Sequence, residues 1–138
     1  MPARSSQAVW QGDLKGGSGS MKLASGAYEG AFSWSSRFEN GTGTNPEELV
    51  GAALSGCFSM AVANSLSQKG FKVNSINTTS TVHLEKTDAG MAITHIDLVT
   101  KGDVEGIDAA AFQEAADAGC IVSRALSAVP LTIDASLV

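Results

Sequence analysis

The chain has 138 residues, which is enough for one domain, expected over residues 1–138. Its composition, 43% hydrophobic and 17% charged, is typical of a globular protein that is poor in charge. The net charge is −5 and the Lys and Arg residues are scattered, so no basic stripe is present to neutralise phosphates and nucleic-acid binding is not expected. The N-terminus lacks the apolar segment of a secretory signal, which predicts a cytoplasmic protein.

The first third of the sequence predicts three short strands. Residues 7–14 and 20–25 form a hairpin around the Gly-rich turn at 15–19, and residues 31–34 form a third strand. No Walker pattern or GxGxxG follows, so a phosphate-binding loop is not supported. The segment 35–44 is expected to be a loop, because it contains the turn signal Asn40-Gly41.

A long helix follows over residues 45–70. Asn45 is a good N-cap, and Pro46 stands at the first helical position, where a missing N–H costs nothing. Glu48 is three residues beyond Asn45 and predicts a capping box. Gly70 supplies the C-terminal stop.

The middle of this helix is apolar or small nearly all round, and it carries Cys57. The uncharged segment 49–68 is about long enough to span a membrane, but Ser, Gly, Asn and Gln dilute it, and a buried helix is favoured. One sheet covers only one helix face. A second subunit is therefore expected to cover the other, which predicts an intimate homodimer.

The second half predicts a long hairpin, two helices and a last strand. The expected elements are strands 72–86 and 91–101 around the turn 87–90, helices 109–118 and 121–128, and a strand at 131–137. The order βββ-α-ββ-αα-β indicates an α+β fold with helices on one side of antiparallel sheets.

Two histidines and two cysteines are the remaining candidates for chemistry. His83 and His95 lie on the paired strands and could face each other, but with Cys57 and Cys120 they show no zinc-binding spacing. We therefore expect no metal and no cofactor. Taken alone, Cys57 is most simply a buried core thiol.

Several motifs together resemble those of the OsmC/Ohr family, the osmotically inducible protein C and organic hydroperoxide resistance group. The resemblance covers nearly the whole chain, and the SRFE loop and the DAG hairpin resemble the OsmC branch more closely. Its motifs are WQGDLKGGSG, SRFE, NPEELVGAALSGCFSMAVA, VHLEK, AGMAITHIDL, GIDAAAF and AGCIVS.

The resemblance implies an intertwined homodimer with two sites at its interface, acting as a cysteine-based peroxidase on organic and inorganic hydroperoxides in oxidative and osmotic stress defence. It implies that Cys57 is the peroxidatic thiol and Cys120 the resolving thiol, with Arg37 and Glu47 as the activating arginine and its carboxylate. An external dithiol of the lipoyl type is the implied reductant. The family often has proline after the second cysteine, where this chain has Ile121.

The chemistry of peroxide reduction leads to the same residues. The reaction needs a thiolate, and Cys57 lies too far along its own helix for that helix's dipole to lower its pKa. Arg37 can supply the cation, and Glu47 can hold it because Glu48 already caps the helix. Glu47 and Cys57 are ten positions apart, about 15 Å along a helix axis. Arg37 and Glu47 are therefore expected to come from the other subunit.

The oxidised Cys57 would be a sulfenic acid, which can condense with Cys120, expected at a cleft, to a disulfide. Phe38, Phe58 and Met60 could line an apolar peroxide pocket, although core packing is the simpler role. The alternative function is a non-catalytic OsmC-fold module that binds a small hydrophobic ligand or a partner.

Overall fold

The computed structural model describes residues 1–138, which divide into two compact units, Met1–Leu49 and Val50–Val138. We call them the N-terminal and the C-terminal unit. The single domain expected over the whole chain stays a prediction. The α+β class and the expected strand and helix order are confirmed, with one short helix added.

The N-terminal unit is a three-stranded antiparallel meander of β1 (Ser6–Gln11), β2 (Ser18–Leu23) and β3 (Glu29–Ser33). The Gly-rich segment between β1 and β2 is a hairpin connection, as predicted. Trp10 on β1 and Phe32 on β3 pack with ring centroids 5.2 Å apart. This aromatic pair gives the small sheet an apolar face.

A short helix, α1 (Trp34–Phe38), lies where the sequence predicted only a loop. Ser33 caps it: the Ser33 side chain accepts the backbone N–H of Ser36, and the Ser36 hydroxyl oxygen accepts the backbone N–H of Ser33. A pair of serines can form a capping box in place of the usual Ser and Glu. The correction matters because α1 carries Arg37.

The long helix α2 (Pro46–Gln68) has nearly the predicted bounds. The Asn45 side chain accepts the backbone N–H of Glu48 at 2.8 Å, which confirms the N-cap. The predicted return bond from Glu48 to Asn45 is wrong, because the Glu48 carboxylate instead accepts the Thr44 hydroxyl at 2.7 Å. Gly70 ends the helix with φ +89°, a backbone conformation that favours glycine.

The C-terminal unit has its own sheet in the order β4-β5-β6, made of β4 (Lys72–Thr87), β5 (Gly90–Glu105) and β6 (Leu131–Leu137). β4 and β5 pair antiparallel as predicted, whereas β5 and β6 pair in parallel. The prediction of purely antiparallel sheets is therefore wrong for β5 and β6. The helical connection through α3 (Ala109–Asp117) and α4 (Ile121–Ala125) allows the parallel pairing, because parallel neighbours need a crossover.

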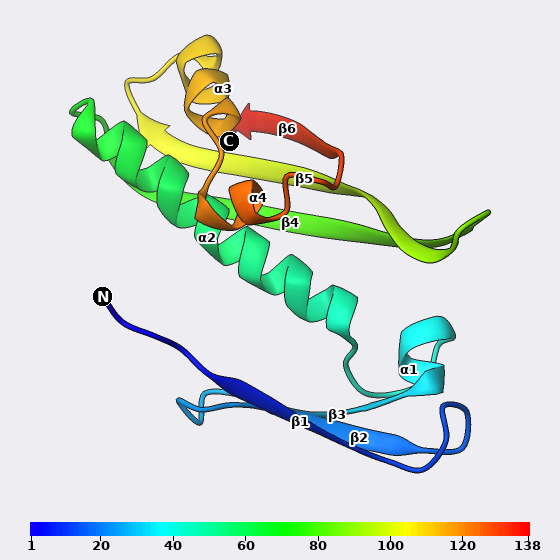
Figure 1. Cartoon of the computed structure of the whole chain (residues 1–138). Helices are drawn as coiled ribbons and strands as arrows, with labels where there is room; N and C mark the ends of the chain where they lie inside the picture. Colours follow the sequence, from blue (N-terminus) through cyan, green and yellow to red (C-terminus); the bar gives the residue numbers. More distant parts are fainter. The chain divides into compact units, whose positions relative to one another are not determined.

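Helices cover one face of this sheet. Figure 1 shows α2 crossing β4 and β5, with α4 beside α2 and α3 beside β6. The core contains a four-residue stripe from α2, two strand residues and an α3 aromatic: Leu54, Phe58, Val62, Leu66, Ile96, Leu98 and Phe112, all at most 1% exposed. Burying a side chain of this size contributes about 1.5–3 kcal/mol.

The face of α2 that points away from this sheet carries exposed residues. Met60 is 75% exposed, although Phe58 and Val62, two residues before and after it in the sequence, are buried. By length and composition alone, α2 could cross a membrane, a test that core helices also pass. The apolar residues at every fourth position of α2 pack in the core against the β4-β5-β6 sheet. This packing is typical of a core helix in a globular protein.

Candidate active site

The two cysteines lie in one pocket of the C-terminal unit. The pocket has a volume of about 360 Å³ and is lined by Cys57, Met60, Ala61, Asn64, Gly119, Cys120, Ile121 and Arg124. Both thiols are reduced. The structure therefore brings together Cys57 and Cys120, which are far apart in the sequence.

Local structure around α4 places Cys120. Asp108 caps α3 by accepting the backbone N–H of Ala111 at 2.8 Å, as predicted. Gly119, with φ +69°, then turns the chain into Cys120, which is the N-cap of α4. The Cys120 sulfur accepts the backbone N–H of Ser123 at 3.4 Å, and the Cys120 N–H donates to the Ser123 hydroxyl at 2.8 Å. Cys120 is 3% exposed, more buried than the cleft position expected for it, although it still lines the pocket.

The surroundings of Cys57 favour its thiolate. The backbone N–H of Val122 is the chief cause that lowers the pKa of Cys57, while partial burial opposes it. The Cys120 side chain, the backbone N–H of Ile121 and the positive charge of Arg124 lower this pKa further. A hydrogen bond donated to the thiolate, or a nearby cation, favours the charged form of the cysteine. These groups therefore raise the population of the thiolate, which is the nucleophilic form.

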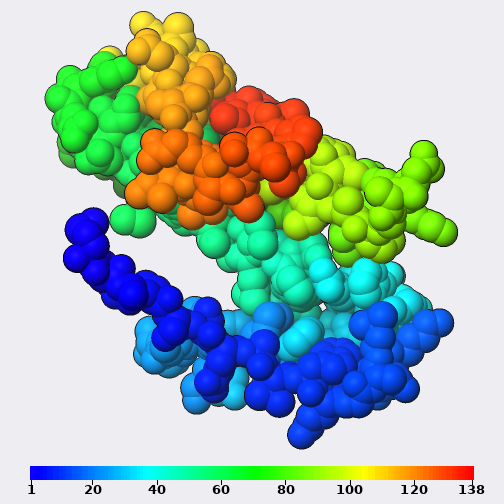
Figure 2. All heavy atoms as spheres, in the orientation of Figure 1, coloured from blue at the N-terminus to red at the C-terminus, as the bar shows by residue number.

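This source of activation was not predicted from the sequence. The dipole of the helix that carries Cys57 cannot reach the thiol, and an external cation was therefore expected. The amides come from a different helix, α4, whose first N–H groups have no intrahelical partner. The helix predicted directly after Cys120 was the signal that could have indicated these amides, because the N–H groups of its first turn have no partner within the helix. Arg124 lies on the same helix. Figure 2 shows the α4 segment, in orange, at the surface.

Arg37 and Glu47 form a second preassembled pair, in the N-terminal unit. Arg37 Nη2 donates to Glu47 Oε1 at 2.7 Å, and Arg37 Nε donates to both carboxylate oxygens at 3.2 Å. The Glu47 side chain is 9% exposed and that of Arg37 38%. This forked geometry is the strong form of a carboxylate–guanidinium pair. The predicted partnership between these two residues is present.

The loop between α1 and α2 sets the position of this pair. The Ser36 hydroxyl donates to the Thr44 carbonyl at 2.7 Å, and the Asn45 side-chain amide donates to the Ser36 carbonyl at 3.0 Å. These bonds connect the two helices that carry Arg37 and Glu47. The arginine is thus held by its carboxylate and by a fixed loop.

An apolar hollow borders Arg37 on the same unit. It has a volume of about 210 Å³ and is lined by Trp10, Leu14, Phe32, Ser33, Trp34, Arg37 and Phe38. Of the three residues predicted to line an apolar pocket, Phe38 lines this hollow, Met60 lines the thiol pocket, and Phe58 is fully buried in the core.

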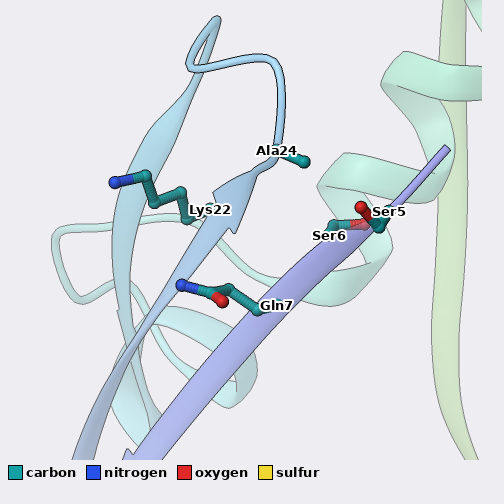
Figure 3. A pocket seen from close by; sticks show the side chains of 5 residues that line it. All are labelled: Ser5, Ser6, Gln7, Lys22 and Ala24. Carbon is teal, nitrogen blue, oxygen red and sulfur yellow. The ribbon is translucent and has the colours of Figure 1, made fainter.

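A third hollow, of about 300 Å³, lies at the end of the hairpin of β1 and β2. Figure 3 shows its lining residues, Ser5, Ser6, Gln7, Lys22 and Ala24. Its single charged group, Lys22, pairs with Glu29 at 3.6 Å, and no histidine or carboxylate lies among the lining residues to activate the two serines. It offers no catalytic chemistry.

The sequence is similar to a described protein family and to named relatives. Residues 39–134 match the family model "OsmC-like protein". Over 135 residues, the chain is 47% identical to Peroxiredoxin OsmC of Escherichia coli (strain K12), covering 95% of this chain and 94% of that protein. The same figures hold for Peroxiredoxin OsmC of Shigella flexneri.

Solved structures share the fold at lower identity. The organic hydroperoxide resistance protein OhrB of Bacillus subtilis superposes with a TM-score of 0.72 at 20% identity, covering 97% of this chain and 98% of that one. An OsmC-like protein from Mycoplasma pneumoniae gives a TM-score of 0.74 at 17% identity, with 99% and 98% covered.

Proposed function

The chain belongs to the OsmC family, and we propose that it is a cysteine-based peroxidase that reduces hydroperoxides. The observation that carries the proposal is Cys57, a thiol of lowered pKa that shares one pocket with a second reduced thiol, Cys120. The name of the 47% identical relatives, Peroxiredoxin OsmC, supports the same activity. We propose Cys57 as the peroxidatic thiol, Cys120 as the resolving thiol, and Arg37 and Glu47 as the assisting pair.

The reaction begins with the Cys57 thiolate, which attacks one oxygen of the hydroperoxide. The O–O bond breaks, the alcohol leaves after taking a proton, and Cys57 becomes a sulfenic acid. The Cys120 sulfur then attacks the Cys57 sulfur, hydroxide leaves as water, and a Cys57–Cys120 disulfide forms. The peroxide gains two electrons, and the two thiols lose them. An external dithiol, of the lipoyl type in our proposal, restores both thiols by exchange.

The Arg37–Glu47 pair would assist the step in which the O–O bond breaks. A guanidinium held by a carboxylate can donate hydrogen bonds to the oxygen that gains charge, without changing its own protonation. Glu47 and Cys57 stand ten residues apart on one helix, about 15 Å along its axis. We therefore propose that the pair serves the Cys57 of a second subunit.

The proposed homodimer would also cover apolar surface. Met60 and Ile121 are 75% and 72% exposed, and both line the thiol pocket. Exposed apolar side chains next to a reactive thiol suit a contact with a second copy. The aromatic hollow beside Arg37 would then hold the organic part of a hydroperoxide.

The cytoplasm is the proposed location, because a Cys57–Cys120 disulfide that must be reduced after each turnover needs a reducing compartment.

The proposal is tested by mixing the reduced protein with one equivalent of cumene hydroperoxide. We expect two thiols per chain to be lost, together with the mass of two hydrogen atoms. The Cys57→Ser variant should lose no thiol, whereas Cys120→Ser should retain a Cys57 that oxidises further to the sulfinic acid. Unchanged thiol content in the wild-type protein would contradict the proposed activity.

A further inference from the structure

Three possible metal ligands meet on the face of the β4-β5-β6 sheet that lies away from α2. His83 on β4 is directly opposite His95 on β5, and Asp97 is two residues further along β5 on the same face. The two imidazole rings stack with centroids 3.8 Å apart. The ligand atoms of all three residues lie within 4.8 Å of one another.

The Asp97 carboxylate lies within reach of both rings. His83 Nε2 is 2.8 Å from Asp97 Oδ2, and His95 Nε2 is 3.7 Å from the same oxygen. The Asp97 side chain contacts the Thr132 hydroxyl through Oδ1 and His83 through Oδ2, and an aspartate is ordinarily a carboxylate at neutral pH. One negative oxygen and two imidazole nitrogens therefore converge.

Neighbouring threonines orient two of these ligands. Thr132 on β6 donates a hydrogen bond to Asp97 Oδ1, which leaves Oδ2 for the histidines. Thr94 donates to Glu85, so the Thr94 oxygen can accept Nδ1–H of His95 at 3.2 Å. That bond keeps the lone pair of His95 on Nε2. Hydrogen bonds of this kind behind the ligands are typical of metal sites in proteins.

We propose that His83, His95 and Asp97 bind a divalent first-row transition-metal ion, for which Zn²⁺ is the probe. Two imidazoles and one carboxylate are ligands that Zn²⁺ takes at about 2.0–2.2 Å, and in a tetrahedral site these bond lengths separate the ligand atoms by about 3.3 Å. The two observed N–O separations, 2.8 Å for His83 and 3.7 Å for His95, lie on either side of this value. Small rotations of half-exposed side chains suffice to seat the ion, and a water completes four-coordination.

The proposed site is separate from the thiol pocket. Side chains alternate along a strand, so His83 and Val82 point to opposite faces, and Val82 packs toward Gly51 of α2. Cys57 and Cys120 lie on the helix-covered face, with the core. The two histidines and two cysteines show no zinc-binding spacing, and no metal was therefore expected from the sequence. A cross-strand His pair with a carboxylate has no such spacing signature.

The test is calorimetric titration of the full chain with ZnCl₂ near neutral pH. The background is Cys57→Ser/Cys120→Ser, because two thiols could bind zinc by themselves. We expect one Zn²⁺ per chain. His83→Gln and His95→Gln should each weaken binding at least tenfold, and Thr132→Val should weaken it about tenfold because it acts through Asp97. Asp134→Asn, which removes an exposed carboxylate on β6, is the matched control and should bind like the background.

Two further readouts separate this site from general structural effects. Co²⁺ bound to the Cys57→Ser/Cys120→Ser chain should show tetrahedral d–d bands that His95→Gln abolishes and Asp134→Asn retains. With both cysteines present, His95→Gln should retain the thiol loss caused by cumene hydroperoxide. Absence of stoichiometric zinc binding in the background chain, or equal binding by His83→Gln and Asp134→Asn, would overturn the proposed metal site.

Discussion

Replacing Ile121 with proline tests whether backbone amides of α4 activate Cys57. Ile121 is the first residue of α4, a position that proline favours and whose N–H has no partner within the helix. The preceding residue, Cys120, has φ −143° and ψ 177°, the extended conformation that proline requires before it. The Ile121 side chain is largely exposed, so its loss costs little packing. The substitution should thus remove one N–H and leave the helix in place.

The expected effect is a higher pKa for Cys57, since the N–H of Ile121 is one of the groups that lower it. Hydrogen bonds to charged groups contribute about 1.5–3 kcal/mol in general, but sulfur is a weak acceptor and Val122 supplies the larger share. We therefore expect about 0.5–1 kcal/mol, which is roughly a two- to fivefold smaller thiolate population at neutral pH.

The assay is the pH dependence of iodoacetamide alkylation, with the Cys57 peptide followed by mass spectrometry to separate it from Cys120. Alkylation of Ile121→Pro should be slower near neutral pH and should converge with wild type above the ordinary thiol pKa, where both are ionised. Ile121→Ala removes the side chain but retains the N–H, and should behave as wild type. Identical pH profiles for the proline and alanine variants would refute the amide argument.

Four further outcomes are expected. Arg124→Gln should slow Cys57 alkylation near neutral pH by about twofold at low salt, with the difference shrinking at high salt because Arg124 is exposed, and Arg124→Lys should restore the rate. Glu47→Gln should lower the free energy of unfolding in urea by about 1–3 kcal/mol, since it breaks a forked pair whose carboxylate is largely buried, whereas Glu29→Gln at an exposed pair should change it by less than about 0.5 kcal/mol. Gly102→Ala should destabilise by about 1–3 kcal/mol because its Cβ would lie 2.5 Å from the buried Phe112 ring, and an equally stable variant would contradict this packing. Because the folded pKa of Cys57 lies below the unfolded value near 9.0, its thiolate stabilises the fold fully above that value and not below the folded pKa. The stability difference between wild type and Cys57→Ser, measured by urea unfolding at several pH values, should therefore grow as pH rises through this window, and a flat difference would contradict it.

Local signals predicted most of the elements. The bounds of α2 followed from Asn45, Pro46 and Gly70, because capping depends on a few neighbouring residues. The hairpin of β4 and β5 followed from alternation on both sides of a short turn. Helix α1 was missed because its cap is a serine pair, which is also typical of a loop. The parallel pairing of β5 and β6 was missed because strand direction depends on the path of α3 and α4 in space.

The candidate site also has parts that the sequence predicted and parts that depend on the arrangement in space. Cys57, Cys120, Arg37 and Glu47 came from motif resemblance and from the chemistry of a thiolate. The fork between Arg37 and Glu47 was predictable, because a carboxylate is needed to fix an arginine. The cluster of His83, His95 and Asp97 was only partly predictable: strand pairing indicated that the histidines face each other, but the approach of Asp97 depends on register and on Thr132 of β6.

The activation of Cys57 shows why side-chain reasoning alone was incomplete. Two of the four groups that lower its pKa are backbone N–H groups, which every residue except proline carries and no motif records. Their effect depends on where α4 begins, and Cys120 determines that as its N-cap. The resolving cysteine in our proposal would therefore have a second role before any disulfide forms, because it starts the helix whose amides favour the Cys57 thiolate. A family member with proline in place of Ile121 would retain that start and lack one of the amides.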